Sequence, residues 1–384
     1  MTHSPAPFEI AVPQSDLDDL HRRLENARFP AELPGSDWDY GTDQSFLKSF
    51  VDQWRSDYDW RTTEAELNVI GSFITTAAGQ RVHFLHRRSA DEAAIPVALV
   101  HGWPGSIIEF LDAVPLLHDR YHPPVVISMP GYGFSGGPTT ERGIDTGRVA
   151  AAVAEVMTQL GYERFLAQGG DWGGALVVRY LGEHYPDRAV AIHTNMLFAS
   201  ADGPDAMDGV TEEEVAAFVA SAERMAEGTA YMEIQGTRPH SLGYGLEDSP
   251  VGLAGWILEK FHAWSDVRDG MPIRTSRLID NLMMYWLTGT ATSAARLYYE
   301  AAHAGTGALS PWSGRVDVPT GYAVSPPREL VRIPKVWADK HYRLVHYSIQ
   351  DRGGHFAAFE QPQLFAADLL AYADVLDELG IFFR

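Results

Sequence analysis

The chain has 384 residues, of which 45% are hydrophobic and 21% charged, so it can bury a large core and is not a disordered polymer. Its formal net charge of −21 argues against nucleic acid and anionic membrane surfaces as partners, since both require clusters of Lys and Arg. The sequence contains no cysteine, which excludes disulfides, thiolate metal sites and a cysteine nucleophile.

The start of the chain and its hydropathy lead us to expect a cytoplasmic protein. Residues 1–20 show neither the basic segment nor the apolar core of a signal peptide. No stretch approaches 18 uninterrupted apolar residues, so we expect no membrane span.

The first ninety or so residues have mainly helical patterns. Ser15 is predicted to cap a helix that carries Leu17, Leu20 and Leu24 on one side. A second apolar stripe at helical spacing runs through residues 46–54. Residues 68–89 then predict two short strands joined by a turn at residues 78–79.

From residue 95 short apolar runs alternate with helical segments. Runs at 96–100, 125–129 and 164–167 predict strands, with helices over 147–161 and from 173 to 185. This alternation is typical of a mostly parallel sheet with helical crossovers, and it indicates an α/β fold. Residues 206–309 are helical and aromatic instead, and we expect them to form a lid over the carboxyl ends of the strands. Strand patterns return at 316–322 and 342–347, before a final amphipathic helix around residues 364–370.

The central motif is Gly169-Gly170-Asp171-Trp172-Gly173, which lies between a predicted strand and a predicted helix. A strand-to-helix turn of the form G-x-nucleophile-x-G lifts one side chain above the edge of the sheet. Glycines are needed there because the turn is strained and crowded. The motif therefore predicts Asp171 as the nucleophile.

Two further motifs complete the predicted site. His101-Gly102-Trp103-Pro104-Gly105-Ser106 follows the first strand of the core, where this architecture supplies a backbone N–H to an oxyanion hole. By position the two N–H donors are those of Trp103 and Trp172. His355 follows two glycines near the C-terminus, and it comes last in the expected order of nucleophile, acid and histidine.

The acid that orients His355 is less well determined by position. Glu329 follows the strand at 316–324 and precedes the strand before His355. Asp317 and Asp339 are alternatives. A charged residue in such a loop is usually just solvated, so position alone does not identify the acid.

With these motifs in place, the chain resembles the microsomal-type epoxide hydrolases, including the juvenile-hormone epoxide hydrolases and their soluble relatives. HGWPGS, GGDWG, YMEIQGTRP, SPVGLAGWILEKF, YWLTGT, VPTGY and RGGHFAAFEQP carry the resemblance in the family's order, over nearly the whole chain. It implies an α/β-hydrolase fold with an N-terminal extension over 1–92, core segments over 93–205 and 310–384, and a helical lid over 206–309. The microsomal enzymes carry a membrane anchor, and we expect none here.

The resemblance also implies roles for individual residues. It makes Asp171 the nucleophile, Glu329 the acid and His355 the base, and it makes Tyr231 and Tyr298 the two ring-opening acids. Tyr299 stands beside Tyr298, so the second tyrosine is open by one position. A bulky apolar or aryl epoxide is the implied substrate, with no metal or organic cofactor, and relatives suggest a homodimer.

Other functions fit the same motifs less well. A haloalkane or haloacetate dehalogenase shares the fold and the aspartate, but a departing halide needs N–H donors rather than acids, so two lid tyrosines favour epoxides. A serine esterase is disfavoured because an aspartate holds the nucleophile position. A binding protein without activity would have to keep the turn, the oxyanion loop and the histidine together without any chemical use for them.

Overall fold

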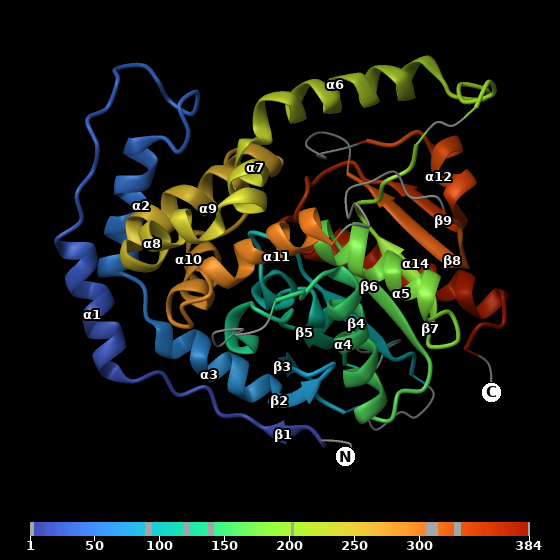
Figure 1. The fold of residues 1–384 in the computed structure, drawn as a ribbon, viewed down its shortest axis with the longest axis horizontal. Helices are drawn as coiled ribbons and strands as arrows, with labels where there is room; N and C mark the ends of the chain where they lie inside the picture. The colour runs from blue at the N-terminus through green and yellow to red at the C-terminus, as the bar shows by residue number, and fades with distance from the viewer. Residues whose placement is uncertain are drawn as a thin grey trace.

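The computed structural model describes residues 4–88, 94–117, 121, 123–136, 142–200, 203–304, 314–325 and 332–382. Its centre is a nine-stranded sheet with the order β1-β2-β3-β5-β4-β6-β7-β8-β9 (Figure 1). The strands are β1 (Ala6–Pro7), β2 (Ser72–Ala77), β3 (Gln80–Leu85), β4 (Val97–Val100), β5 (Val125–Ile127), β6 (Phe165–Gly169), β7 (Ala189–Thr194), β8 (Val316–Val324) and β9 (Tyr342–Ile349).

The sheet combines an antiparallel edge with a parallel core. Strands β1, β2, β3 and β5 pair antiparallel, whereas all neighbours from β5 to β9 pair parallel. The predicted α/β architecture is thus confirmed, and so is the predicted hairpin. Its turn places Ala78 and Gly79 at φ angles of 48° and 74°. Parallel strands end at the same edge of the sheet, so the loops that follow β4, β6 and β9 can meet there.

Helices cover both faces of the sheet. Gly182 of α5 packs against Ile192 of β7, while Asp368 of α14 contacts the next residue, His193. Because successive strand residues point to opposite faces, α5 and α14 lie on opposite sides (Figure 1). The helices around the core are α4 (Thr146–Gln159), α5 (Arg179–His184), α12 (Lys335–His341), α13 (Ala357–Glu360) and α14 (Pro362–Glu378), with shorter turns η1 (Ile107–Phe110), η2 (Val114–Leu116), η3 (Gly133–Ser135) and η4 (Trp172–Val178).

Six of the described helices lie between β7 and β8 in the chain, so residues 212–303 are mainly helical, as the pattern predicts (Figure 1). They are α6 (Glu212–Gly228), α7 (Ala230–Thr237), α8 (Pro239–Asp248), α9 (Pro250–Trp264), α10 (Thr275–Trp286) and α11 (Ala291–His303). The N-terminal helices α1 (Gln14–Glu25), α2 (Gln44–Ser56) and α3 (Trp60–Ile70) run along the outside of this group. None of the described helices is long and apolar enough to span a bilayer.

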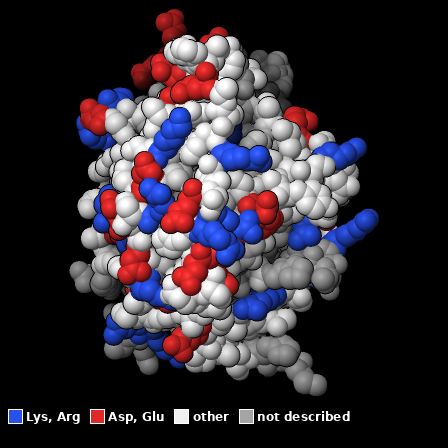
Figure 2. Space-filling model, turned by 90° about the vertical axis from the view of Figure 1, so that its left-hand side faces the viewer, with Lys and Arg blue, Asp and Glu red and all other residues white. Residues whose placement is uncertain are grey.

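Arg23 joins the N-terminal helix α1 to α8, one of the helices between β7 and β8. Arg23 of α1 binds Asp248 of α8 at 2.9 Å and Asp19 at 2.6 Å. Figure 2 shows acidic and basic side chains interspersed over this face, without a large patch of either sign.

The predicted cap of α1 is wrong: the helix begins at Gln14 after Pro13, and Ser15 lies inside its first turn. Pro13 occupies the N-cap position, with φ −56° and ψ 139°, and no side chain caps the helix.

Candidate active site

Asp171 lies in a strained turn directly after β6. Its φ of 49° and ψ of −132° are unusual for a residue with a side chain. The turn is tight because the backbone of β4 passes close by: a Cβ on Gly173 would lie 2.1 Å from the carbonyl oxygen of Val100. The predicted strand–turn–helix setting of Asp171 is present, although the helix opens with the seven π-helical residues of η4.

The two carboxylate oxygens of Asp171 face different partners. The backbone N–H of Trp103 donates to Oδ1 at 2.8 Å. Nε2 of His355 lies 3.1 Å from Oδ2, and the His355 side chain is only 1% exposed. Trp103 and His355 thus contact the same carboxylate, although they lie 68 and 184 residues from Asp171 in the sequence.

The oxyanion loop approaches Asp171 very closely. A Cβ on Gly102 would lie 2.3 Å from both Cβ and Oδ1 of Asp171, so only glycine fits. His101 holds the loop through hydrogen bonds of its imidazole. Burial lowers the pKa of His101 to about 4, so the imidazole is neutral near pH 7. Its Nε2 accepts from the N–H of Met129 at 3.2 Å, which leaves Nδ1–H to donate to the carbonyl of Gly102 at 3.0 Å.

Helix α10 holds the other end of the loop, a contact that the sequence patterns did not reveal. Asn281 donates from Nδ2 to the carbonyl of Pro104 at 2.9 Å and accepts from the hydroxyl of Ser106 at 2.7 Å. Tyr285 donates from its hydroxyl to the carbonyl of Gly105 at 2.7 Å. Both side chains are buried, so these bonds do not exchange readily with water.

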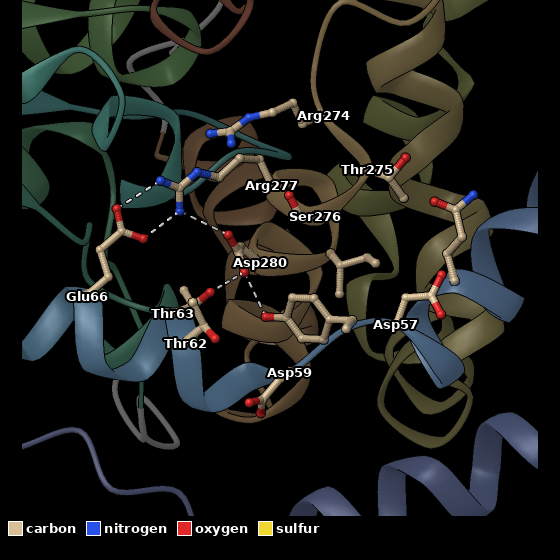
Figure 3. Close-up of a pocket in the computed structure, with 13 residues that line it drawn as sticks. Asp57, Asp59, Thr62, Thr63, Glu66, Arg274, Thr275, Ser276, Arg277 and Asp280 are labelled. Atoms are coloured by element: carbon tan, nitrogen blue, oxygen red, sulfur yellow. Dashed lines mark hydrogen bonds and ion pairs between the residues drawn. The ribbon is translucent and has the colours of Figure 1, made fainter.

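Helix α10 is itself anchored through a buried arginine. Arg277 binds both carboxylate oxygens of Glu66 at 2.8 Å, Asp112 at 2.8 Å and Asp280 at 3.1 Å. Tyr58 donates to Asp280 at 2.7 Å. Tyr58, Glu66, Arg277 and Asp280 line a cavity between α3 and α10, shown in Figure 3. The cavity lies away from Asp171, and its charges are largely paired, so we assign it an anchoring role.

His355 is held by backbone and side-chain contacts on both sides. Its N–H donates to the carbonyl of Trp264 at 2.9 Å, and its carbonyl accepts from Asn195 at 2.8 Å. Glu360 accepts from the N–H of Phe356 at 3.0 Å and from that of Asp266 at 2.7 Å. Burial raises the pKa of Glu360 to about 7.

The acid predicted to orient His355 is Glu329, which lies outside the described residues. Nδ1 of His355 is buried and has no hydrogen-bond partner within the described part of the chain. The surroundings of the two alternatives do not favour them. Asp317 is 84% exposed and pairs with Arg315, and Asp339 is 41% exposed and pairs with Lys335.

The two predicted lid tyrosines face each other across the site. Tyr231 comes from α7 and Tyr298 from α11, and their ring centroids are 5.8 Å apart. Tyr298 also packs against Trp172 at 4.6 Å, whereas Tyr299 stacks on His303 at 4.0 Å. The structure therefore places Tyr298 and not its neighbour at the site. Burial and, to a smaller extent, negative charge nearby raise the pKa of both site tyrosines.

A small cavity lies between Asp171 and the tyrosines. Its remaining walls are apolar and formed by Trp172, Ala175, Leu176, Met196, Phe198, Met225 and Met232. A second, smaller cavity lies on the other side of Asp171. Glu109, Gln168 and Asn195 line it together with His355. Burial raises the pKa of the Glu109 carboxyl well above its usual value, and the charge of Asp171 raises it further.

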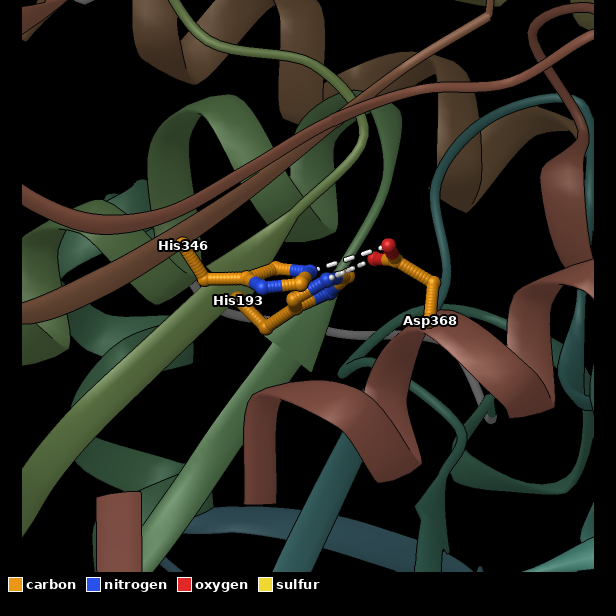
Figure 4. A group of neighbouring side chains, drawn as sticks. All are labelled: His193, His346 and Asp368. Atoms are coloured by element: carbon orange, nitrogen blue, oxygen red, sulfur yellow. Dashed lines mark hydrogen bonds and ion pairs between the residues drawn. The ribbon is translucent and has the colours of Figure 1, made fainter. Parts of the chain in front are cut away.

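Among the described residues, one cluster has the donor types of a metal site. His193 and His346 each contact Asp368 through Nε2, at 2.8 Å and 2.9 Å, as Figure 4 shows. Both carboxylate oxygens are thus already hydrogen-bonded, and Nδ1 of His193 has no partner within the described chain. A metal-bound imidazole almost always donates its other N–H to an acceptor. The cluster therefore fits a carboxylate shared by two imidazoles better than a metal centre.

Comparisons with known proteins agree with this geometry. Residues 5–110 match the family model described as epoxide hydrolase N terminus, and residues 95–235 match the alpha/beta hydrolase fold. Epoxide hydrolase 1 of Sus scrofa is 33% identical, over 97% of this chain and 89% of that protein. A relative from Stigmatella aurantiaca that also bears the epoxide hydrolase name is 44% identical, over 94% of this chain and 83% of its own length.

Solved structures give the same result. The juvenile hormone epoxide hydrolase of the silkworm Bombyx mori superposes with a TM-score of 0.88 at 32% identity, over 98% of this chain and 96% of that one. The Aspergillus niger epoxide hydrolase superposes with a TM-score of 0.85 at 31% identity, over 97% of each chain. The chain therefore belongs to the epoxide hydrolase family and has its α/β-hydrolase fold.

Proposed function

We propose that this chain hydrolyses an epoxide to a vicinal diol, with Asp171 as the nucleophile and residues 206–309 as the lid. The observation that carries the proposal is the position of the Asp171 carboxylate. It lies between the N–H of Trp103 and Nε2 of His355, and it lines the same cavity as Tyr231 and Tyr298. A nucleophile, a base and two acids thus surround one space.

In the first half-reaction Oδ2 of Asp171 attacks a ring carbon and forms a C–O bond, while the bond from that carbon to the ring oxygen breaks. A carboxylate suffices because the strained ring needs no strongly basic nucleophile, and it is ionised at neutral pH. The ring oxygen takes a proton from Tyr231 or Tyr298 and becomes a hydroxyl group. The product is an alkyl ester of Asp171.

In the second half-reaction a water molecule attacks the carbonyl carbon of the Asp171 ester. His355 accepts the proton of this water, and Glu329 is proposed to orient the imidazole. The oxyanion is stabilised by the N–H groups of Trp103 and Trp172. When the ester bond breaks, the diol oxygen takes the proton from His355, and Asp171 is left as a carboxylic acid that carries the second proton of the water. Transfer of this proton to the tyrosine phenolate restores both the Asp171 carboxylate and the tyrosine hydroxyl.

The apolar walls of the cavity favour a bulky apolar or aryl epoxide. Apart from Asp171 and the tyrosine hydroxyls, the cavity offers few polar groups that could recognise a polar substituent. A panel of styrene oxide and larger aryl and alkyl epoxides, followed on a chiral column, tests this part of the proposal. Higher kcat/KM for small polar epoxides than for all of these would contradict it.

The mechanism is tested by separating the two half-reactions. Asp171→Ala is expected to abolish turnover, and His355→Gln to accumulate the ester, so intact mass spectrometry of His355→Gln with styrene oxide should show one covalent adduct. His303→Gln is the matched control, because His303 is an exposed histidine that stacks on Tyr299. Normal turnover by His355→Gln would contradict the scheme. Release of halide from haloalkanes at a higher kcat/KM than diol formation would identify a dehalogenase instead.

A further inference from the structure

Tyr231 lies between an aromatic ring and a positive charge. On one side its ring stacks on the indole of Trp103, with centroids 5.0 Å apart and planes within 10°. The ammonium nitrogen of Lys260 lies 4.7 Å from the centroid of the same tyrosine ring. It also lies 5.7 Å from the ring of Trp264. Helix α9 thus brings one cation to Tyr231 of α7, one of the two tyrosines.

The position of Lys260 is unusual for a lysine. Its side chain is 7% exposed, and its ammonium group pairs with Glu259 at 2.6 Å. Lysine is almost never fully buried without a partner, because the charged group loses its hydration. Glu259 is 29% exposed, so the ion pair reaches the surface, and the same ammonium group also lies over the ring of Tyr231.

The two lid tyrosines differ in this respect. The ring neighbours of Tyr298 are Trp103, Trp172 and Tyr231, and within the described residues no cation lies over its ring. Burial and the charge of Asp171 make proton loss harder for both hydroxyls. Only Tyr231 has a cation close enough to oppose these two effects.

We propose that Lys260 is a positioning residue that acts through Tyr231: its ammonium group stabilises the phenolate that forms on Tyr231 when the epoxide ring opens. This inference rests on the proposed function. In that step Asp171 forms the C–O bond, the ring C–O bond breaks, and the proton of Tyr231 moves to the ring oxygen. The tyrosine ring gains negative charge as the proton leaves, so a cation over its face is bound more strongly in the transition state than before. Tyr231 is then the principal proton donor, and Tyr298 mainly a hydrogen-bond donor.

The test is the rate of ester formation with styrene oxide, measured in single-turnover experiments by rapid quenching and intact mass spectrometry. Lys260→Met keeps the length of the stem and removes the charge. A cation–π contact of about 0.5–2 kcal/mol corresponds to a rate about 2- to 30-fold lower. Hydrolysis of the ester, measured separately, is expected to be unchanged, and Lys260→Arg is expected to restore most of the rate. Lys335→Met is the matched control, since Lys335 lies 5.6 Å from the ring of Tyr347, outside the site.

A double-mutant cycle distinguishes this role from a structural one. Adding Lys260→Met to Tyr231→Phe is expected to change the rate of ester formation little, whereas adding it to Tyr298→Phe should cost the full factor. Equal losses in both backgrounds, or an equal loss in ester formation and ester hydrolysis, would overturn the proposal. If His355→Gln forms no adduct at all, the proposed function has failed rather than the role of Lys260.

A second variant decides the matter if Lys260→Met does not fold. Glu259→Gln removes the negative partner and leaves the cation over Tyr231. If the charge of Lys260 acts through Tyr231, ester formation becomes faster, because Glu259 no longer offsets the ammonium charge beside the tyrosine ring. A slower or unchanged rate in a folded Glu259→Gln variant would count against the proposal, because a merely structural ion pair gives that result.

Discussion

The N–H of Trp103 donates to Oδ1 of Asp171 at 2.8 Å, on the opposite oxygen from the one that faces His355. The two oxygens of the carboxylate are therefore distinguished before any substrate binds. An N–H donor stabilises an oxyanion. We therefore expect Oδ1 to become the ester carbonyl and Oδ2 to bond to the substrate.

Labelling with oxygen-18 water tests whether water attacks the ester of Asp171 rather than the substrate. If water attacks the carbonyl carbon of the ester, the first turnover transfers an oxygen of Asp171 to the diol and leaves an oxygen of water in the protein. After turnover, the proteolytic peptide that contains Asp171 is expected to carry oxygen-18, as measured by mass spectrometry. Incubation without epoxide is the control. A diol that contains solvent oxygen already in a single turnover, with an unlabelled peptide, would mean that water attacks the substrate directly.

The parts of this site that the sequence predicted are those that the local backbone dictates. The turn at Asp171 needs glycines around it and a strand before it, so five residues suggest its conformation. The identity of the lid tyrosines rested on family resemblance, since nothing local distinguishes Tyr298 from Tyr299. The helix decides between them, because adjacent residues point about 100° apart and only one can face the cavity.

Other features depend on contacts that no local pattern encodes. Glu109 and Lys260 look like ordinary surface charges in the sequence, and only their burial beside the site gives them significance. Asn281 contacts Pro104 in the oxyanion loop, although the two residues are 177 positions apart in the sequence. The cap at Ser15 was wrong because Pro13 already sets the start of the helix, which a search for capping side chains overlooks.

Tyr285→Phe tests the support of the oxyanion loop. The ring would stay packed, but the carbonyl of Gly105 would lose its buried donor, which costs about 1–3 kcal/mol of stability. The loop that carries Trp103 would also be less well fixed, so kcat should fall, but by less than the about 100- to 1000-fold expected when an oxyanion donor is lost outright. Steady-state kinetics and urea unfolding check both effects. Tyr244→Phe is the control because Tyr244 is 80% exposed, and equal effects of the two substitutions would contradict the role.

Asp280→Leu tests the anchor of α10. Asp280 accepts from Tyr58 and Thr63 and pairs with Arg277, and it is 2% exposed. Removing one partner of such a buried network leaves polar groups unpaired, so we expect a loss of about 3–5 kcal/mol in the free energy of unfolding.

Urea or thermal unfolding measures how much the free energy of unfolding falls when the Asp280 carboxylate is removed. Arg352→Gln provides the comparison, since Arg352 and Asp269 form a pair that is 59% and 71% exposed. Exposed pairs contribute about 0–1 kcal/mol. A loss from Asp280→Leu no larger than that from Arg352→Gln would show that the network does not anchor the helix.

Glu360 predicts a specific dependence of stability on pH. Burial raises its pKa from 4.5 to about 7, so between these values the folded protein holds a proton that the unfolded chain has released. The free energy of unfolding must then fall as the pH rises through this range, by at most about 1.4 kcal/mol per pH unit from this group. Above pH 7 the contribution is constant, because the carboxyl is ionised in both states.

Glu360→Gln removes this proton without removing the side chain. The difference in free energy of unfolding between Glu360→Gln and the unchanged protein should therefore vary with pH from 4.5 to 7 and level off above it, while contributions from Glu109 and Asp368 cancel in the difference. The amide keeps only one acceptor for the N–H groups of Phe356 and Asp266, so the His355 loop should loosen and slow ester hydrolysis at every pH. Urea unfolding across the pH range, with the exposed Glu233→Gln as control, measures the first effect, and single-turnover ester hydrolysis the second. A difference that is flat between pH 4.5 and 7 would mean that Glu360 ionises in the folded protein as it does in the unfolded chain.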